Sequence, residues 1–515
     1  MVGVPENGIE YPNLIEADAS GRFDTDVVVV GTGAGGAPVA RRLREAGHDV
    51  MMVEEGGLHR TASFTTDQLA GARRLYRDGG TSMIMGRPPI MFAEGRCVGG
   101  STVINGGMAW RTPEPVLARW SGELGLDHTD EASMRPYLDE AEQILHVEHQ
   151  RPDTLGRNDE LFVQGARRMG WEPRDNPRNM HRCMGLNNCA LGCPTGAKQS
   201  MLVTEIPRAL AAGATLLTGA RVDRVVFEGR RAVGVSGRFV DDKGRGKRRF
   251  TVRASLVVLA AGARHTPGIA LRSRLRAKGI GHGLHTHPNA KVVGVFDERI
   301  DPWIGAHQSH QVHDFLQEGI LMAYAAVPPG ILAVGIPGFG DAHGHRMSEY
   351  NNMLTAGCLV DDTGQGRVRL GPDRQPWMSF KLSDRDTDNI HRGVRMLSEL
   401  MFAAGARKVL LPFGDLLELD SADDLGLIDR RPRVTSNIEL MTVHIMSSMR
   451  MAARAADGPC DAWGRARGSS GLVVADASAV PSSVGVNPMG TIVALALRNS
   501  ARWAEDLGRG EHAAV

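Results

Sequence analysis

A glycine-rich turn near the start of the chain constrains the fold more than any other feature. Four consecutive valines precede it, and Gly31, Gly33 and Gly36 then match the pattern G-x-G-x-x-G. A second apolar run, Val50 to Val53, ends on Glu54. Strand, turn, helix, strand and acid in this order are typical of a Rossmann βαβ unit, whose helix N-terminus binds a pyrophosphate. The segment therefore predicts a dinucleotide site.

Each residue of this pattern has its own physical role. Gly31 permits the tight turn, Gly33 lets the backbone approach a pyrophosphate, and Gly36 lets the helix pack on the strand. Glu54 can accept hydrogen bonds from a ribose diol, which argues against a phosphorylated ribose. A G-x-G-x-x-G pattern alone also occurs in glycine-rich turns that bind nothing. The second strand and its acid favour the dinucleotide interpretation.

Length and composition limit the classes of protein that this chain can be. Its 515 residues exceed one ordinary core, so two or more domains are expected. Sixty basic and fifty-nine acidic side chains give a net charge of +1, and nothing global indicates nucleic-acid or anionic-membrane binding. We see no secretory signal segment and no apolar run long enough for an integral membrane segment. Six cysteines in a chain of this length do not indicate a disulfide scaffold. We expect a cytoplasmic protein, although export with a partner subunit would leave no trace.

The pattern of strands and helices divides the chain into three stretches. Residues 20–290 are expected to form the dinucleotide-binding domain, with a cysteine loop at 183–193. Residues 291–430 alternate in strand-like runs around one strong helix and predict an inserted antiparallel-sheet domain for the substrate. Residues 431–510 return to the first domain. The predicted fold class is α/β, or α+β, with a Rossmann-like domain and this insertion.

Four separated blocks then stand in a specific order along the chain. They are GTGAGGAPVARRL with VEEGG, GRCVGGSTVINGG, VVLAAGARHTP, and TVHIMSSMRM with GLVVADASAVPSSVGVNPMG. With these blocks the chain resembles the glucose–methanol–choline (GMC) oxidoreductases. The segments LYRDGG and CALGCPTGAKQS place the resemblance near the long-chain alcohol oxidases and the bacterial FAD-dependent alcohol and glucose dehydrogenases.

The resemblance implies FAD as the bound dinucleotide and assigns residues to it. The residues implied to hold FAD are Gly31, Gly33, Gly36, Glu54, Gly99, Gly100, Ser101, Asn105, Gly106, Val222, Asp476, Ala477, Asn487, Pro488 and Met489. A permanently held flavin supplies the redox chemistry, and the protein supplies its placement.

The resemblance also implies which residues are catalytic. His444 stands where the family has its active-site histidine, and Asn487 where the family has a second histidine or an asparagine. A neutral imidazole can take the hydroxyl proton of an alcohol while a hydride moves to flavin N5. The expected product is an aldehyde or a ketone, the substrate a hydrophobic or bulky alcohol, and the electron acceptor a quinone or a cytochrome. An oxidase that reduces O2 to H2O2, a lyase with an idle flavin, and a flavin-binding protein without turnover stay open. The oligomeric state does not follow from the sequence.

Three cysteines lie close together in the sequence at Cys183, Cys189 and Cys193, and a proline follows the last. This spacing resembles the loop of certain bacterial glucose dehydrogenases that holds a three-iron (3Fe-4S) cluster, so the three thiolates are candidate iron–sulfur ligands. A loop without metal is the alternative, because a fourth thiolate is missing. A zinc site with His181 is less favoured, because that histidine lies only two residues from Cys183.

Three further features are open to a structural or a functional interpretation. The histidines of GAHQSHQVHDF recur every third residue, and we expect solvent or pocket positions for them rather than a metal site. The stretch Ala325 to Gly340 is apolar and rich in proline and glycine, which favours a loop that lines or covers a substrate entrance. Met446, Met449 and Met451 could wall a pocket for a bulky substrate or be ordinary core residues.

Overall fold

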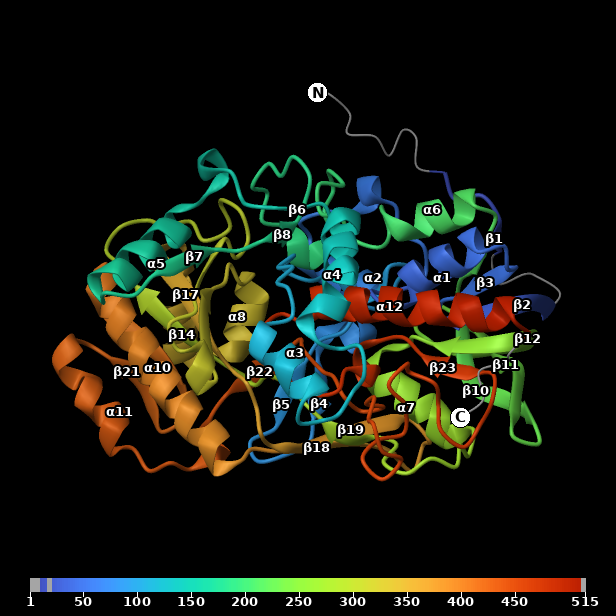
Figure 1. The fold of residues 1–515 in the computed structure, drawn as a ribbon. Coiled ribbons are helices and arrows are strands. Elements are labelled where there is room, and N and C mark those ends of the chain that lie inside the picture. Colours follow the sequence, from blue (N-terminus) through green and yellow to red (C-terminus); the bar gives the residue numbers. More distant parts are fainter. Residues whose placement is uncertain (1–9, 16–20, 511–515) are drawn as a thin grey trace.

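The computed structural model describes residues 10–15 and 21–510 of the chain. Two large β-sheets lie side by side, each with its own helices (Figure 1). The sheet that contains β2 and β12 lies on the right of the view, and the sheet that contains β14 and β17 lies on the left. The mixed α/β fold with a Rossmann-like region is therefore as predicted.

The first sheet is built around the valine strand. β2 (Arg22–Val30) lies parallel to both β3 (Val50–Val53) and β12 (Gly246–Leu259). β23 (Leu472–Val474), almost at the other end of the chain, pairs in parallel with β12. Because these strands are parallel, they all end at one edge of the sheet, where ligands of α/β folds bind. The chain brings Gly31, Glu54 and Asp476 to that edge.

The remaining strands complete the first sheet on its two sides. Its order is β1-β9-β3-β2-β12-β11-β10, with β23 beside β12. β1 (Leu14–Ile15) and β9 (Thr215–Leu217) lie beyond β3, and the antiparallel pair β10 (Ala220–Glu228) and β11 (Arg231–Val240) lies beyond β12. The basic run Lys243 to Arg249 lies at the hairpin between β11 and β12.

Helices from distant parts of the chain cover this sheet. α1 (Gly36–Glu45) contacts α6 (Glu205–Ala211) and the long C-terminal helix α12 (Met489–Gly508). α12 in turn contacts α4 (Glu131–Leu145), as Figure 1 shows. Their apolar faces form one core with the sheet, in which Val27 and Val29 are fully buried. Met446, Met449 and Met451 belong to this core, so they are core residues and not a pocket wall.

The second sheet is mainly antiparallel and takes strands from several parts of the chain. Its order is β4-β5-β22-β14-β17-β16-β15-β7, with β20 and β21 attached to β14. The bounds are β4 (Ser82–Ile84), β5 (Ile90–Phe92), β7 (Pro173–Asp175), β14 (Asn289–Val295), β15 (His310–Val312), β16 (Ile320–Tyr324), β17 (Met353–Val360), β20 (Lys408–Phe413), β21 (Leu416–Leu419) and β22 (Leu440–Thr442). The domain boundaries 20–290, 291–430 and 431–510 stay a prediction.

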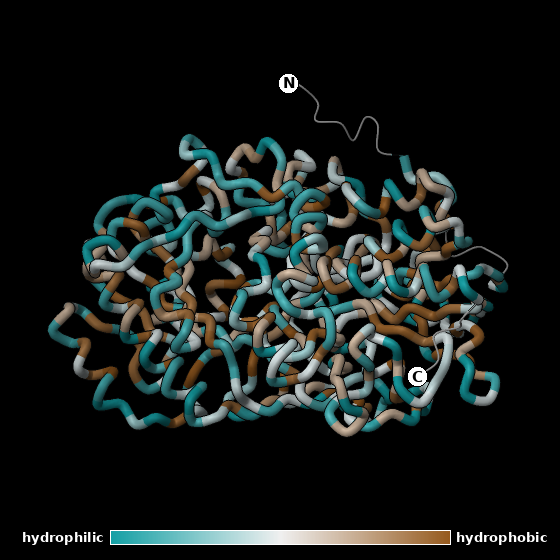
Figure 2. The backbone as a smooth tube through the Cα atoms, in the orientation of Figure 1, coloured by the Kyte–Doolittle hydropathy of each residue, from teal (hydrophilic) through white to brown (hydrophobic). Residues whose placement is uncertain are grey.

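One face of the second sheet packs against two helices. α10 (Asp384–Ala404) begins with a capping box between Ser383 and Asp386, which satisfies backbone N–H groups that the helix itself leaves unpaired. α10 contacts α5 (Arg157–Arg168) and the strands β14 and β17. Figure 2 shows hydrophobic segments running through the interior of both halves of the molecule. The opposite face of the second sheet is left to line the site.

The other helices and strands connect these layers. They are α2 (Gln68–Leu75), α3 (Glu114–Ser121), α7 (Gly262–Arg272), α8 (Pro329–Gly335), α9 (Gly340–Ser348), α11 (Gly426–Arg430), β6 (Val147–Glu148), β8 (Arg178–Asn179), β13 (His282–Leu284), β18 (Gln365–Leu370) and β19 (Pro376–Lys381). Among the helices in residues 10–15 and 21–510, none combines the length and the apolar character needed to cross a bilayer.

Candidate active site

The glycine turn between β2 and α1 has the geometry of a phosphate-binding loop. Gly31 has a φ of 101°, and a Cβ there would lie 2.3 Å from the carbonyl oxygen of Ala260. A Cβ on Gly36 would lie 2.1 Å from the oxygen of Gly31, so this glycine serves helix packing, as expected. A Cβ on Gly33 would meet nothing within 4 Å, which leaves its backbone open to a ligand. α1 begins without a side-chain cap, so no side chain occupies its first N–H groups.

Gly35 is a further constraint that the motif did not reveal. A Cβ on this residue would lie 1.4 Å from the carbonyl oxygen of Ala475, in the segment that joins β23 to Asp476. No side chain can be placed there without moving one of the two backbones. The glycine turn and the C-terminal segment are therefore in direct backbone contact.

Glu54 lies at the end of β3, buried at 7% exposure, and lines the cavity. Its Oε2 accepts hydrogen bonds from the N–H of Thr32 at 3.1 Å and from its hydroxyl at 2.8 Å, and its Oε1 accepts one from Gly56 at 2.9 Å. Burial raises the pKa of Glu54, and these hydrogen bonds oppose that rise. Oε1 accepts only one of these bonds and can accept a second, so an acceptor position for a ribose hydroxyl is still available.

A cavity of about 1310 Å³ extends from the glycine turn to the second sheet. It is larger than the roughly 300–1,000 Å³ of an ordinary small-molecule site, which gives room for a dinucleotide and a substrate together. Of the predicted residues, those that line it are Gly31, Gly33, Glu54, Gly100, Ser101, Asn105, Gly106, Val222, His444, Asp476, Ala477, Asn487, Pro488 and Met489. Gly36 and Gly99 do not line it. A Cβ on Gly99 would clash with Val103 and Leu202, so Gly99 serves packing.

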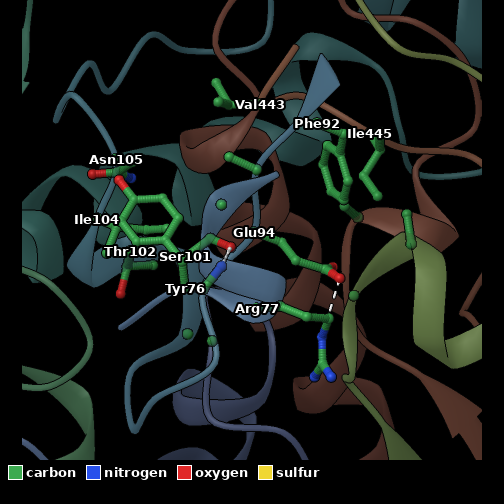
Figure 3. Close-up of a pocket in the computed structure, with 18 of the residues that line it drawn as sticks. Tyr76, Arg77, Phe92, Glu94, Ser101, Thr102, Ile104, Asn105, Val443 and Ile445 are labelled. Carbon is green, nitrogen blue, oxygen red and sulfur yellow. Dashed lines mark hydrogen bonds and ion pairs between the residues drawn. The ribbon is translucent and has the colours of Figure 1, made fainter. Parts of the chain in front are cut away.

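Figure 3 shows one wall of this cavity, with Tyr76, Ser101 and Asn105 on one side and Val443 and Ile445 on another. The dashed line at Arg77 marks its ion pair with Glu94, whose Nε–Oε1 distance is 3.1 Å. Burial alone would raise the pKa of Glu94. The neighbouring His265, Arg77 and Arg264 outweigh it and lower that pKa to about 2. The wall is thus held by ion pairs of the Glu94 carboxylate with Arg77 and Arg264, and burial lowers the pKa of the neighbouring His265.

The residues present fit FAD on two observations. The Oδ1 atom of Asn105 is buried and has no hydrogen-bond partner within the described residues, as expected for a group that bonds to a ligand. Asp476 is fixed by four donors, the N–H groups of Gly262 and Ser478 and the hydroxyls of Thr266 and Ser478, at 2.5–2.8 Å. Burial raises the pKa of Asp476. Both residues lie where the resemblance assigns contacts with the cofactor.

His444 has a partner on each ring nitrogen, and its side chain faces the cavity. Its Nε2 lies 3.3 Å from Nδ2 of Asn487, and its Nδ1 lies 3.2 Å from Nδ1 of His287. Burial lowers the pKa of His444 well below its ordinary value, and His287 and Lys291 lower it further. The imidazole is therefore neutral near pH 7 and can accept a proton.

The neighbouring amides determine which nitrogen of His444 carries the lone pair. Gln311 donates its Nε2–H to Oδ1 of Asn487 at 3.2 Å, which turns the Nδ2–H of Asn487 toward Nε2 of His444. With Nε2 as acceptor, the proton of the neutral ring lies on Nδ1. His287 then accepts that Nδ1–H, and its own Nε2–H donates to Ser483 at 2.9 Å. Nε2 is thus the ring nitrogen that carries the lone pair, and in this structure that lone pair accepts the amide N–H of Asn487 on the cavity side.

Four residues of this network were not identified from the sequence. They are His287, Gln311, Ser483 and Asp361, which accepts a short hydrogen bond from the hydroxyl of Ser483. The backbone N–H of Gly485 also points at Nε2 of His287, at 3.2 Å, so the opposite tautomer of His287 has a partner too. His287 has a φ of 41°, in a region that residues other than glycine rarely adopt.

The second sheet presents polar side chains to the same cavity. Asn289 and Lys291 on β14 and Gln311 on β15 line it, together with Gly357 on β17. A signal for Lys291 is present in the sequence, because this lysine interrupts the apolar run of its strand.

The iron–sulfur expectation is not supported by the structure. Within residues 10–15 and 21–510, no group of three or more His, Cys, Asp or Glu side chains is placed to hold a metal ion. Each of the three sulfurs instead contacts a different hydrogen-bonding group of the protein. Cys183 accepts from the Gly185 N–H at 3.5 Å, Cys189 from Arg178 at 3.5 Å, and Cys193 lies 3.3 Å from the Thr195 hydroxyl. Cys183, Cys189 and Cys193 therefore do not converge as ligands.

Of the three clustered histidines one has the pocket position that was expected, and the apolar loop contributes to the cavity wall. His307 lines the cavity, whereas His310 forms ion pairs with Asp159 and Asp175, and His313 packs on Trp110. The stretch that begins at Ala325 contributes a row of apolar residues to the cavity wall, and its central part forms α8.

Comparisons with known proteins agree with this site. Two family models described as GMC oxidoreductase match residues 72–289 and 362–496. An uncharacterized GMC-type oxidoreductase of Mycobacterium tuberculosis is 36% identical over 494 residues, covering 95% of this chain and 77% of its own. A long-chain-alcohol oxidase of Arabidopsis thaliana is 28% identical over 529 residues, covering 94% and 68%. A 2-methyl-1,2-propanediol dehydrogenase of Mycolicibacterium austroafricanum is 25% identical over 555 residues, covering 92% and 94%.

Solved structures share the fold at lower sequence identity. Pyridoxine 4-oxidase from Mesorbium loti superposes with a TM-score of 0.70 at 17% identity, covering 93% of this chain and 99% of that chain. A formate oxidase of Aspergillus oryzae, studied for its FAD modification, gives a TM-score of 0.70 at 16% identity, covering 96% and 100%. At these identities the likeness concerns the fold alone.

Proposed function

The chain belongs to the GMC oxidoreductase family, and from that premise we propose that it oxidises an alcohol to an aldehyde or a ketone with bound FAD. One observation carries this proposal. The Nε2 lone pair of His444 and the amide of Asn487 are held together at a cavity that also contains the glycine turn. The family and its flavoprotein neighbours imply FAD, which supplies the hydride-accepting chemistry when bound.

The side chains then have distinct tasks. Nε2 of His444 accepts the hydroxyl proton of the alcohol once the amide N–H of Asn487 turns from Nε2 to the alcohol oxygen, since the ring is neutral and lines the cavity. Asn487 orients the alcohol oxygen, because Gln311 fixes the direction of its amide. His287 holds the ring of His444 through Nδ1, in the manner of an orienting third group. Asp476, Asn105 and the turn at Gly33 hold the cofactor.

The substrate that we propose has an apolar or bulky part. Val327, Ile331 and Val334 line the cavity on one side and Leu69 of α2 lines it on the other. Leu69 and Val334 are both 59% exposed, which places them at the mouth. The N–H of Gly330 at the start of α8 donates to Gln68 of α2 at 3.3 Å, so the two helices meet across this mouth. An apolar substituent of the alcohol would lie between them.

We propose that the electrons pass to an acceptor other than oxygen, such as a quinone or a cytochrome. The diol dehydrogenase of Mycolicibacterium austroafricanum is in keeping with such an acceptor. The second candidate is an oxidase that produces H2O2, which the long-chain-alcohol oxidases among the relatives favour. A lyase with an idle flavin is the third, and it predicts no flavin reduction by any alcohol.

Anaerobic mixing of the FAD-loaded protein with a panel of alcohols tests the proposal. Bleaching of the flavin absorbance near 450 nm, which is about the usual absorption maximum of an oxidised flavin, is the expected result. The His444→Ala variant, checked for bound FAD, is the control, and its flavin should bleach about 100- to 10,000-fold more slowly. Absence of bleaching across primary, secondary and diol substrates would overturn the oxidoreductase proposal. Hydrogen peroxide measured in air then separates the oxidase from the dehydrogenase.

A further inference from the structure

Lys291 is a half-buried lysine on the face of the second sheet that lines the cavity. In β14, Ala290 and Val292 point into the apolar core of the sheet, so the alternation of the strand turns Asn289 and Lys291 to the other face. Lys291 pairs in register with Gly357 of β17. A Cβ on Gly357 would lie 2.6 Å from Nζ of Lys291 and 2.5 Å from Oδ1 of Asn289. The missing side chain of Gly357 thus makes the space that both polar groups occupy.

No counter-charge accompanies this ammonium group. Within the described residues, Lys291 has neither a hydrogen bond nor an ion pair to another side chain. Burial lowers the pKa of Lys291 to about 8, and the nearby Cys358 thiol is the group that opposes this shift. That thiol is itself neutral, because burial raises its pKa to about 12. At pH 7 the ammonium group of Lys291 therefore faces the cavity without a neighbouring anion among the described residues, and a ligand carboxylate would supply one.

A second polar group beside Lys291 also lacks a partner. The Oδ1 atom of Asn289 is buried and has no hydrogen bond within the described part of the chain. Buried polar atoms of proteins are nearly always bonded, so an orphan beside an unpaired cation indicates a ligand site. An amide can offer either its oxygen or its N–H2 to a bound molecule.

These two groups lie at the catalytic end of the cavity. Lys291 is close enough to His444 to lower its pKa electrostatically, and both line the same cavity as Asn487. A ligand held by Lys291 therefore lies beside the position at which the hydroxyl group would be oxidised. Leu69 and Val334, in contrast, lie at the mouth.

We propose that the substrate is a hydroxy acid, whose carboxylate binds Lys291 and Asn289 while its hydroxyl group meets His444. The inference rests on the proposed alcohol oxidation and names the class of alcohol. One lysine and one amide match the single charge and two oxygens of a carboxylate. A phosphate carries up to two charges and is usually held by arginines or several N–H donors, which this end of the cavity does not offer. The apolar residues at the mouth then take the carbon chain.

The experiment compares each hydroxy acid with its own methyl ester, which keeps the alcohol and removes the charge. Glycolate, lactate, a β-hydroxyalkanoate and ω-hydroxyalkanoates of increasing length serve as substrates for the FAD-loaded protein. At least one acid is expected to exceed its ester in kcat/KM, and Lys291→Met is expected to reduce that kcat/KM by about 100-fold with little change for esters. Lys381→Met, an exposed lysine on β19, is the matched control and should change neither.

A binding measurement keeps the two proposals separable. Octanoate, which cannot be oxidised, should perturb the flavin absorbance of the wild-type protein and bind far more weakly to Lys291→Met, whereas octanamide should not discriminate. Gly357→Ala provides a second variant, since its new methyl group displaces Nζ of Lys291. If no alcohol reduces the flavin but octanoate binding depends on Lys291, the oxidation proposal fails and the anion site stands. Equal losses for acids and esters, or equal binding of octanoate and octanamide, would overturn the anion site.

Discussion

The two histidine rings of the site meet through like atoms, Nδ1 of His287 and Nδ1 of His444, at 3.2 Å. Their planes are at 83°, so the edge of one ring faces the other. A hydrogen bond between two neutral imidazoles needs one of them to donate and the other to accept. The state of His287 therefore selects the tautomer of His444, and with it the atom that can take a proton.

Replacement of His444 by alanine should remove the acceptor of the hydroxyl proton. We expect the rate of flavin reduction to fall about 100- to 10,000-fold, the usual contribution of a general base. The FAD content should be unchanged, because the cofactor contacts are assigned to other residues. Stopped-flow absorbance gives the rate, and the flavin-to-protein absorbance ratio gives the content. A variant that reduces at the wild-type rate contradicts the role of His444.

Replacement of His287 by alanine should act through His444 alone. The loss of one hydrogen bond of about 1 kcal/mol corresponds to a fall in kcat of about five- to tenfold. Since His287 contributes to lowering the pKa of His444, the acid limb of the kcat/KM profile should move to higher pH. A purely structural role would change the stability and leave the position of that limb where it was. Ser483→Ala removes a hydrogen-bond partner of His287, and it should move the acid limb of the kcat/KM profile to higher pH by a smaller amount.

The pH dependence should differ between charged and neutral substrates. His444 acts as the neutral base, and because its folded pKa lies well below 6.5, activity toward methyl esters should persist as the pH falls through 6.5 and be lost only at lower pH. Lys291 acts as the cation, and its pKa of about 8 means that kcat/KM for a hydroxy acid falls as pH rises through 8. The Cys358 thiol stays neutral across this range. An identical alkaline limb for acid and ester would argue against Lys291.

Two glycines of the turn should respond differently to alanine. A methyl group at position 35 would overlap the backbone of Ala475, so Gly35→Ala should destabilise the fold by about 3 kcal/mol or more. A methyl group at position 33 meets no protein atom within 4 Å, so Gly33→Ala should unfold close to the wild-type temperature. Its methyl group would instead meet the cofactor and weaken FAD binding. Thermal unfolding of the apoproteins and FAD titration measure the two effects separately, and a Gly33→Ala variant with unchanged affinity would refute close ligand approach there.

The parts of the fold and of the site that depend on a short sequence pattern could be predicted from the sequence. The βαβ unit requires its glycines and acid at fixed spacings, so the turn at Gly31 and the position of Glu54 could be predicted. His444 and Asn487 required the family resemblance, since nothing in their own neighbourhood distinguishes them. His287 and Gln311 could not be predicted, because their roles depend on contacts across the second sheet and between segments far apart in the chain.

Local spacing also misled in one case. Three cysteines within eleven residues predicted a cluster, but the loop backbone turns their sulfurs to different partners. For Lys291, in contrast, the sequence shows an unusual residue but does not show its surroundings. A lysine in an apolar strand is visible in the sequence, yet only the facing Gly357 shows that the ammonium has space in a cavity rather than a place in the core.

The parallel pairing of β5 with β22 has a consequence for how such a protein can change. β5 precedes the segment that carries Ser101 and Asn105, and β22 precedes His444, so one pair of strands sets both the cofactor wall and the base in register. The second sheet thus takes strands from the same chain segments that carry the cofactor wall and His444, so the sheet cannot be exchanged without those segments. We expect new specificity to arise by single substitutions on the cavity-lining face of β14 and its neighbours.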